Sequence, residues 1–387
     1  MNQELIVTRD FFARLESLRG LAALAVAGYH ILGTPWQTAN GSGILISGAP
    51  AYENSAWTAA LKVLKAMFNG NSAVIEFFVL SGFVLFFSLL RNANKPPTGF
   101  TAFCVARIFR IYPATIATIV FFVGVYWMID PTLCKHCFGA RTILANAMLL
   151  ETSIDGVMWS LQVELLAVPV ILAAFYGWHR WGPVPLIALF FIFAALSFVG
   201  PFYRAIGPGL PFHAFIAGMI AAVYGKQLIG GLSPTASRAT FAITVAMFFL
   251  ARPVIGFTSH WSVQVEIIAG AVLIALLAFG QLGRIGALFD AKPVRTLGRL
   301  SFSFYLLHPI VMPFLATASA ATTVGALISV GLPTPLVIIV LIAVSVAVTF
   351  PFAWLMYYLV EQPGIKAGRS VIQRLASARR SPIGQTS

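Results

Sequence analysis

Ten long apolar stretches run through the 387-residue chain and constrain its fold more than any other feature. Each is near the length of a membrane-spanning helix, which needs about 20 mostly apolar residues. Only helices and closed barrels satisfy every backbone polar group in lipid. Charged residues make up 10% of the chain, against roughly 25% in soluble domains, which excludes a water-soluble globule. We therefore expect an all-α polytopic membrane protein with about ten transmembrane helices. The stretches are centred near residues 26, 81, 120, 168, 192, 217, 247, 271, 310 and 347.

The positions of the basic residues predict the orientation of the chain. If the N-terminus is cytoplasmic, 19 of the 25 Lys and Arg residues lie in cytoplasmic segments. Loops rich in Lys and Arg stay on the cytoplasmic side. Both termini are then cytoplasmic, and we expect the protein in the inner (cytoplasmic) membrane of the cell. The net charge of +13 follows from this topology and does not indicate a nucleic-acid partner. The six outer basic residues are Lys62, Lys65, Lys135, Arg141, Arg204 and Arg252.

The chain divides into one transmembrane domain over residues 1–365 and a basic cytoplasmic tail over residues 366–387. No internal repeat is apparent, and the tail is expected to lie on anionic headgroups or to be disordered. Apolar residues at helical spacing between Trp57 and Phe68 predict an interfacial helix over the outer mouth. The first apolar stretch resembles a secretory signal, but the acidic Glu16 in its leader argues against cleavage.

Two of the three cysteines stand close together in a predicted outer loop, as CKHC at residues 134–137. A disulfide in an oxidising compartment is one interpretation. A zinc site is the other, but it would need ligands beyond His136, and we expect no metal.

Arg19 and His30 form the most informative pair of ionisable residues. They are eleven residues apart, about 20° beyond three full helical turns, so they share a helix face and lie roughly 16 Å apart along the axis. Ionisable residues at membrane depth are costly and mark functional sites. Imidazole accepts a proton near neutral pH, so this pair indicates a general base on the same face as an anion-binding cation. The structural alternatives are a snorkelling arginine and a buried histidine satisfied by a neighbouring helix.

Six segments in order resemble the acyltransferase-3 membrane proteins. The first helix of that family is similar to RLESLRGLAALAVAGYH, which carries the spaced Arg and His. The resemblance continues from about residue 12 to residue 366 through five further strings: FFVLSGF (77–83), RIFR (107–110), WSLQVE (159–164), LSFSFYLLHP (300–309) and VEQP (360–363).

This resemblance implies an integral membrane O-acyltransferase that takes an acyl group, commonly acetyl from acetyl-CoA, and places it on a carbohydrate hydroxyl. The resemblance identifies His30 as the catalytic histidine and Arg19, Arg107 and Arg110 as essential arginines. Acyl-CoA is then a donor substrate, with no permanently bound cofactor. The chain departs from the family at Glu76, one position after the usual acidic residue, so we assign it no catalytic role.

The remaining candidates lie on helical faces at the same motifs. Arg107 and Arg110 are one turn apart and can present two guanidinium forks to phosphates, or anchor the helix at the membrane surface. Glu164 shares a face with Ser160 and either orients His30 or neutralises a neighbouring arginine. Ser81 lies beside Gly82, where close helix packing is the alternative to ligand binding.

Ser301, Tyr305 and His308 form a polar stripe at i, i+4 and i+7. The stripe either lines the acceptor path, with Tyr305 and His308 as binding residues, or makes hydrogen bonds to a neighbouring helix. The other histidines, at positions 136, 179, 213 and 260, are assigned no chemistry.

The hypothesis is acyl transfer within the membrane, with His30 and Glu164 as catalytic residues. His30 would act as base or acyl carrier, and the partners would be acyl-CoA, the lipid bilayer and a carbohydrate or glycolipid acceptor. The rival is a transporter or flippase of a glycolipid or acyl group, since buried ionisable residues also mark transport paths. The sequence does not identify the acceptor glycan or the acyl group.

Overall fold

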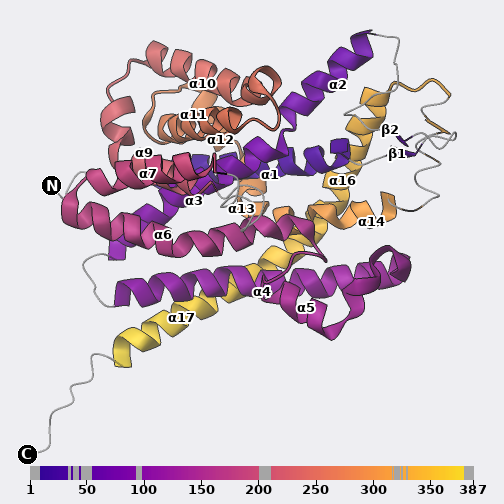
Figure 1. Cartoon of the computed structure of the whole chain (residues 1–387), viewed down its shortest axis with the longest axis horizontal. Coiled ribbons are helices and arrows are strands. Elements are labelled where there is room, and N and C mark those ends of the chain that lie inside the picture. Colours follow the sequence, from indigo (N-terminus) through magenta and orange to yellow (C-terminus); the bar gives the residue numbers. More distant parts are fainter. Residues whose placement is uncertain are drawn as a thin grey trace, which may run out of the picture.

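The structure is a computed structural model that describes residues 9–33, 36–37, 43–44, 55–92, 98–199, 211–315, 317, 323, 326–327 and 330–378. Arg204 and residues 379–387 of the predicted tail lie outside this part of the chain. The described residues fold into a bundle of helices with one pair of two-residue antiparallel strands, β1 (Trp36–Gln37) and β2 (Gly43–Ile44) (Figure 1).

The α-helices differ widely in length, from one turn to about nine. They are α1 (Arg9–Gly33), α2 (Ser55–Met67), α3 (Gly70–Asn92), α4 (Thr98–Ile129), α5 (Ala140–Ala147), α6 (Trp159–Trp181), α7 (Val184–Leu196), α9 (Phe212–Ile229), α10 (Pro234–Ile255), α11 (His260–Phe279), α12 (Arg284–Asp290), α13 (Lys292–Leu307), α14 (Met312–Leu315), α16 (Thr334–Met356) and α17 (Gln362–Ala378). Shorter segments are the 3₁₀ helices η2 (Pro131–Phe138), η3 (Gly156–Met158) and η4 (His308–Val311) and the π-helix η5 (Tyr357–Glu361).

Seven helical runs among the described residues are long and apolar enough to cross a membrane, so the chain is a polytopic α-helical membrane protein. The sequence predicted about ten spans, but three of the apolar stretches form helices that are too short or too polar to count among the seven. Helix α1 has 25 residues but carries Arg19 and His30 within its apolar run. Helix α7 is only 13 residues long. The stretch near residue 310 is interrupted at His308, where α13 gives way to η4.

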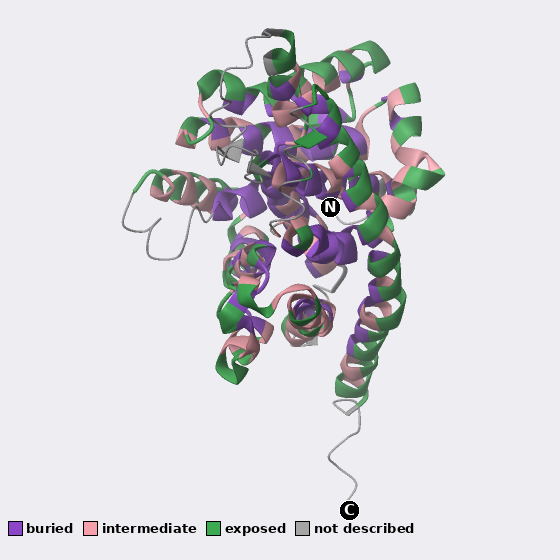
Figure 2. Cartoon of the chain, turned by 90° about the vertical axis from the view of Figure 1, so that its right-hand side faces the viewer, coloured by how far each residue is buried: buried purple, intermediate pink, exposed green. Residues whose placement is uncertain are grey.

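Helices α1, α3, α9 and α13 form the centre of the bundle, where the buried residues concentrate (Figure 2). Helices α3 and α9 cross at very short range because glycines occupy the crossing point on both. A Cβ at Gly82 would collide with the carbonyl oxygen of Phe215, and a Cβ at Gly218 with that of Val79. Small residues let helix backbones approach in this way in membranes. The packing interpretation of Gly82, beside Ser81, is therefore confirmed.

Replacing Gly218 with alanine is expected to destabilise the bundle, because the new methyl group meets backbone atoms of α3 that cannot rotate away. Overpacking of this kind costs about 1–3 kcal/mol. The measurement is the thermal unfolding midpoint of the purified protein. Gly124→Ala in α4 is the matched control, because nothing lies within 4 Å of a Cβ there. An equal effect of both substitutions would contradict the role assigned to the α3–α9 crossing.

The C-terminal region is one long helical run from α16 through η5 into α17 (yellow in Figure 1). The predicted tail thus begins inside α17, which packs on α4 through Gly364 and Gly368 against Phe109 and Pro113. The helix expected between residues 57 and 68 is present as α2.

Candidate active site

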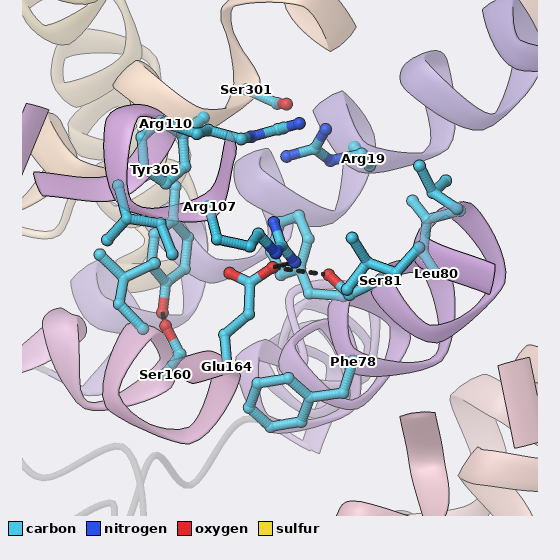
Figure 3. Close-up of a pocket in the computed structure, with 16 residues that line it drawn as sticks. Arg19, Phe78, Leu80, Ser81, Arg107, Arg110, Ser160, Glu164, Ser301 and Tyr305 are labelled. Carbon is cyan, nitrogen blue, oxygen red and sulfur yellow. Dashed lines mark hydrogen bonds and ion pairs between the residues drawn. The ribbon is translucent and has the colours of Figure 1, made fainter. Parts of the chain in front are cut away.

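A narrow pocket lies where α1, α3, α4, α6 and α13 meet (Figure 3). Its volume is about 70 Å³, which is room for a few waters and too little for a nucleotide. We call it the arginine pocket, because three arginines line it. Its polar lining residues are Arg19, Ser81, Arg107, Arg110, Ser160, Glu164, Ser301 and Tyr305.

Glu164 is the one acidic residue in the described lining of this pocket, and it is tied to two neighbours. Its Oε1 accepts a hydrogen bond from Arg107 Nη2 at 2.5 Å and another from Ser81 Oγ at 3.0 Å. The side chains of Arg107 and Glu164 are 8% and 16% exposed, so this ion pair is largely buried. Glu164 therefore neutralises an arginine, which is one of the two roles that its spacing allowed.

The positive charges of Arg19 and Arg110 are not neutralised by Glu164, because this carboxylate is paired with Arg107. Figure 3 shows their guanidinium groups pointing toward one another across the pocket from Glu164, with Ser301 beside Arg110. Arg110 also lies over the ring of Phe302, 6.0 Å from its centroid. Three arginines and one glutamate line the pocket, so its lining carries a net positive charge.

A second cavity of about 200 Å³ adjoins the arginine pocket and shares Arg19 and Arg110 with it. It is also lined by Arg299, Glu16 and Glu361, and it reaches Ile365 in α17. Arg19, Arg110 and Arg299 are among the basic residues that the sequence places on the cytoplasmic side.

A third cavity of about 590 Å³ lies at the other end of α1, and we call it the histidine cavity. His30 lines it together with Tyr29, Tyr126 and Asp155. Residues 154–157, from the segment predicted as an outer loop, form one wall, and Pro309 lies on another. Helix α1 thus places Arg19 and His30 in different cavities, as their separation of about three turns along one face requires.

His30 is paired with His308, whose ring is stacked on it with centroids 5.0 Å apart. The Nδ1 of His30 lies 2.7 Å from the Nε2 of His308, and the Nδ1 of His308 lies 2.6 Å from the backbone oxygen of Tyr305. In a continuous α-helix the backbone oxygen of Tyr305 would accept a hydrogen bond from the N–H of residue 309. Residue 309 is a proline and has no N–H, so this oxygen needs another donor.

These contacts fix the tautomers of two neutral imidazoles. His308 must carry its hydrogen on Nδ1 to donate to a carbonyl, so its Nε2 is an acceptor. His30 must then donate from Nδ1, which leaves the lone pair on its Nε2. The Tyr305 carbonyl, His308 and His30 thus form a chain of two hydrogen bonds that orients the His30 ring.

Tyr305 separates the arginine pocket from the histidine cavity. Its hydroxyl donates to the carbonyl oxygen of Val157 at 3.0 Å and lies 2.9 Å from Ser160 Oγ. The ring of Phe77 packs edge-on against it at 5.4 Å. Val157 lines the histidine cavity and Ser160 the arginine pocket, so these hydrogen bonds place the Tyr305 hydroxyl between the two.

The structure gathers the sequence-predicted site residues into two groups. Arg19, Ser81, Arg107, Arg110, Glu164 and Tyr305 line the arginine pocket, whereas His30 and His308 form the pair at the histidine cavity. His308 was assigned to substrate binding, and its contacts make it the partner of His30. Sequence reasoning missed Asp155 and Tyr126, which lie outside the recognised motifs. The His-Pro dipeptide at 308–309 is the sequence signal that could have indicated the hydrogen bond from His308 Nδ1 to the Tyr305 backbone oxygen.

The CKHC segment forms a disulfide between Cys134 and Cys137, which was one of its two interpretations. His136 lies beside it, with Nε2 3.4 Å from Cys134 Sγ. These three residues are close enough to share an ion, but sulfurs bonded to each other are not thiolate ligands.

A family model described as an acyltransferase domain covers residues 12–354, which includes the arginine pocket, the histidine pair and every helix up to most of α16. No curated protein and no solved structure matches the chain.

Proposed function

This chain belongs to the acyltransferase-3 family of membrane acyltransferases, and on that premise we propose that it transfers an acyl group from cytosolic acyl-CoA to an extracytoplasmic carbohydrate hydroxyl. Acetyl is the proposed acyl group, and the inner membrane is the proposed location. The observation that carries the proposal is the placement of two sites on one helix. Helix α1 holds Arg19 in a narrow cationic pocket and His30 in a larger cavity about three turns away.

The donor is proposed to enter from the side of Arg299 and Ile365. A nucleotide does not fit the arginine pocket, so the bulk of CoA stays in or outside the adjoining cavity, and its phosphates face Arg19 and Arg110. Only a thin chain such as the pantetheine arm can continue inward. The thioester then reaches His30 when the Tyr305 side chain moves aside.

The acceptor is proposed to occupy the histidine cavity. Nε2 of His30 takes the proton of the acceptor hydroxyl as its oxygen attacks the thioester carbonyl, and the C–S bond breaks as the new C–O ester bond forms. The His30 imidazolium returns the proton to the departing CoA thiolate. The products are an O-acyl ester and free CoA. Transfer through an acyl group carried on His30 is the alternative route, and trapping of a labelled protein would favour it.

Two measurements test this function. The purified protein in lipid nanodiscs should convert radiolabelled acetyl-CoA to CoA and labelled ester in the presence of cell glycan. Cells that lack the gene should lose O-acyl groups from one glycan, measured by NMR and mass spectrometry. Unchanged glycan together with no consumption of acetyl-CoA would overturn the proposal. Movement of a glycolipid across the bilayer without a new ester bond would instead support a transporter.

A further inference from the structure

Asp155 is a buried acid at the histidine cavity that no step of the proposed mechanism uses. It is 3% exposed and precedes the η3 helix, where its Oδ1 accepts a hydrogen bond from the backbone N–H of Val157 at 3.4 Å. Its other oxygen, Oδ2, is buried with no hydrogen-bond partner among the described residues.

Burial of such an oxygen raises the free energy of the folded protein, because the atom loses its hydrogen bonds to water and forms none in their place. The residues that line the histidine cavity in the described part of the chain contain no lysine or arginine that could pair with the carboxyl group. Burial raises the pKa of Asp155 to about 8, so the group is mostly protonated at neutral pH. A protonated carboxyl can both donate and accept a hydrogen bond.

The surroundings of Asp155 suit one class of ligand. Tyr29 and Tyr126 line the same cavity, and the ring of Tyr29 lies edge-on to His30 at 5.7 Å. Aromatic rings offer apolar faces with polar edges, and the cavity of about 590 Å³ has room for a small ring. A neutral ring that carries hydroxyl groups matches both features.

We propose that Asp155 is the hydroxyl-binding residue of the acceptor site, and that it holds a second hydroxyl of a sugar ring while His30 deprotonates the reacting one. This inference rests on the proposed function and names the subsite that selects a polyhydroxy acceptor. Oδ2 supplies the contact, and the tyrosines cover the faces of the sugar ring. A site built around such a hydrogen bond discriminates strongly against a ligand that lacks the hydroxyl.

The test compares four purified proteins: the wild type, Asp155→Ala, Asp155→Asn and Asp130→Ala. Asp130 is the matched control, because it caps the 3₁₀ helix η2 through Thr132 on the same predicted outer segment but is only partly buried. The acceptor probe is the unacylated glycan isolated from cells that lack the gene. The measurements are kcat and KM for this glycan, the Kd for acetyl-CoA, and hydrolysis of acetyl-CoA without acceptor.

Asp155→Ala should lower kcat/KM for the glycan by about 10- to 100-fold, through KM, because the second hydroxyl loses its partner. Its Kd for acetyl-CoA should equal that of the wild type, because Asp155 lines neither the arginine pocket nor the cavity that adjoins it. Asp155→Asn should keep most of the activity, since an amide also donates and accepts, and Asp130→Ala should behave as wild type.

The inference is overturned if Asp155→Ala transfers to the glycan as well as the wild type does. It is also overturned if the variant loses acetyl-CoA binding in parallel, or if Asp130→Ala shows the same loss, since either result would indicate a structural role. A wild-type protein that consumes no acetyl-CoA would refute the proposed function itself, whatever the Asp155 variants do.

Discussion

His30→Ala is expected to lower acyl transfer from acetyl-CoA by about 10²- to 10⁴-fold, the usual contribution of a general base. The imidazole of His30 is the proposed proton acceptor, and no other described residue that lines the histidine cavity is a histidine. The KM for acetyl-CoA should change little, because the arginine pocket that is proposed to receive the donor does not include His30. The measurement is the steady-state rate of labelled ester formation in nanodiscs, with protein in the membrane quantified in parallel. Full activity in a well-folded His30→Ala protein would refute the assignment.

Substitutions at His308 separate a positioning role from a merely structural one. His308→Leu removes the acceptor for His30 Nδ1 and should lower kcat about 10- to 100-fold, as loss of an orienting partner does for other functional histidines. His308→Gln restores an oxygen acceptor near the position of Nε2 and should recover part of kcat. Rescue of kcat by glutamine but not by leucine, at equal thermal stability, is the outcome that a packing role would not give.

The sequence identified both His30 and His308 as candidates but did not predict that they contact each other, for a geometrical reason. Helical periodicity alone places Arg19 and His30 on one face, because both belong to the same helix. His308 lies 278 positions away, and only the crossing of α1 with α13 brings its ring onto His30. Gly20 and Gly298 permit that crossing, because a Cβ on either would meet backbone of the other helix. Periodicity within one helix does not report such contacts.

The arginine pocket also shows that helical periodicity does not predict contacts between helices. The motifs identified Arg107 and Glu164 as candidates, but helical spacing left two partners open for the carboxylate. Glu164 lies on α6 and Arg107 on α4, and the packing of these helices with α3 decides that the carboxylate contacts Arg107 and Ser81. Local patterns therefore predicted which residues face the interior, whereas the assembly of the helices determined which of them meet.

Glu164→Leu is expected to be the most destabilising of the substitutions considered. It leaves the Arg107 guanidinium buried without its counter-charge, since Arg107 Nη2 donates to Glu164 at 2.5 Å and the pair is largely screened from solvent. Removal of one partner from a buried pair costs about 3–5 kcal/mol. The measurement is the thermal unfolding midpoint in nanodiscs, followed through intrinsic tryptophan fluorescence. Asp290→Asn is the matched control, because the Arg14–Asp290 pair is partly exposed at 28% and 35% and should contribute little.

A double variant distinguishes the structural role of this ion pair from its role in activity. Arg107→Leu combined with Glu164→Leu removes both charges and should recover most of the lost stability, because well-packed apolar replacements of a buried pair are often neutral or stabilising. Acyl transfer should nevertheless stay low, since the double variant lacks one of the three arginines that line the pocket through which the thin arm of the donor is proposed to pass. Recovery of both stability and activity would show that the pair only fills the bundle interior. Recovery of neither would mean that the hydrogen bond to Ser81 and the shape of the pocket, rather than charge balance, hold α3, α4 and α6 together.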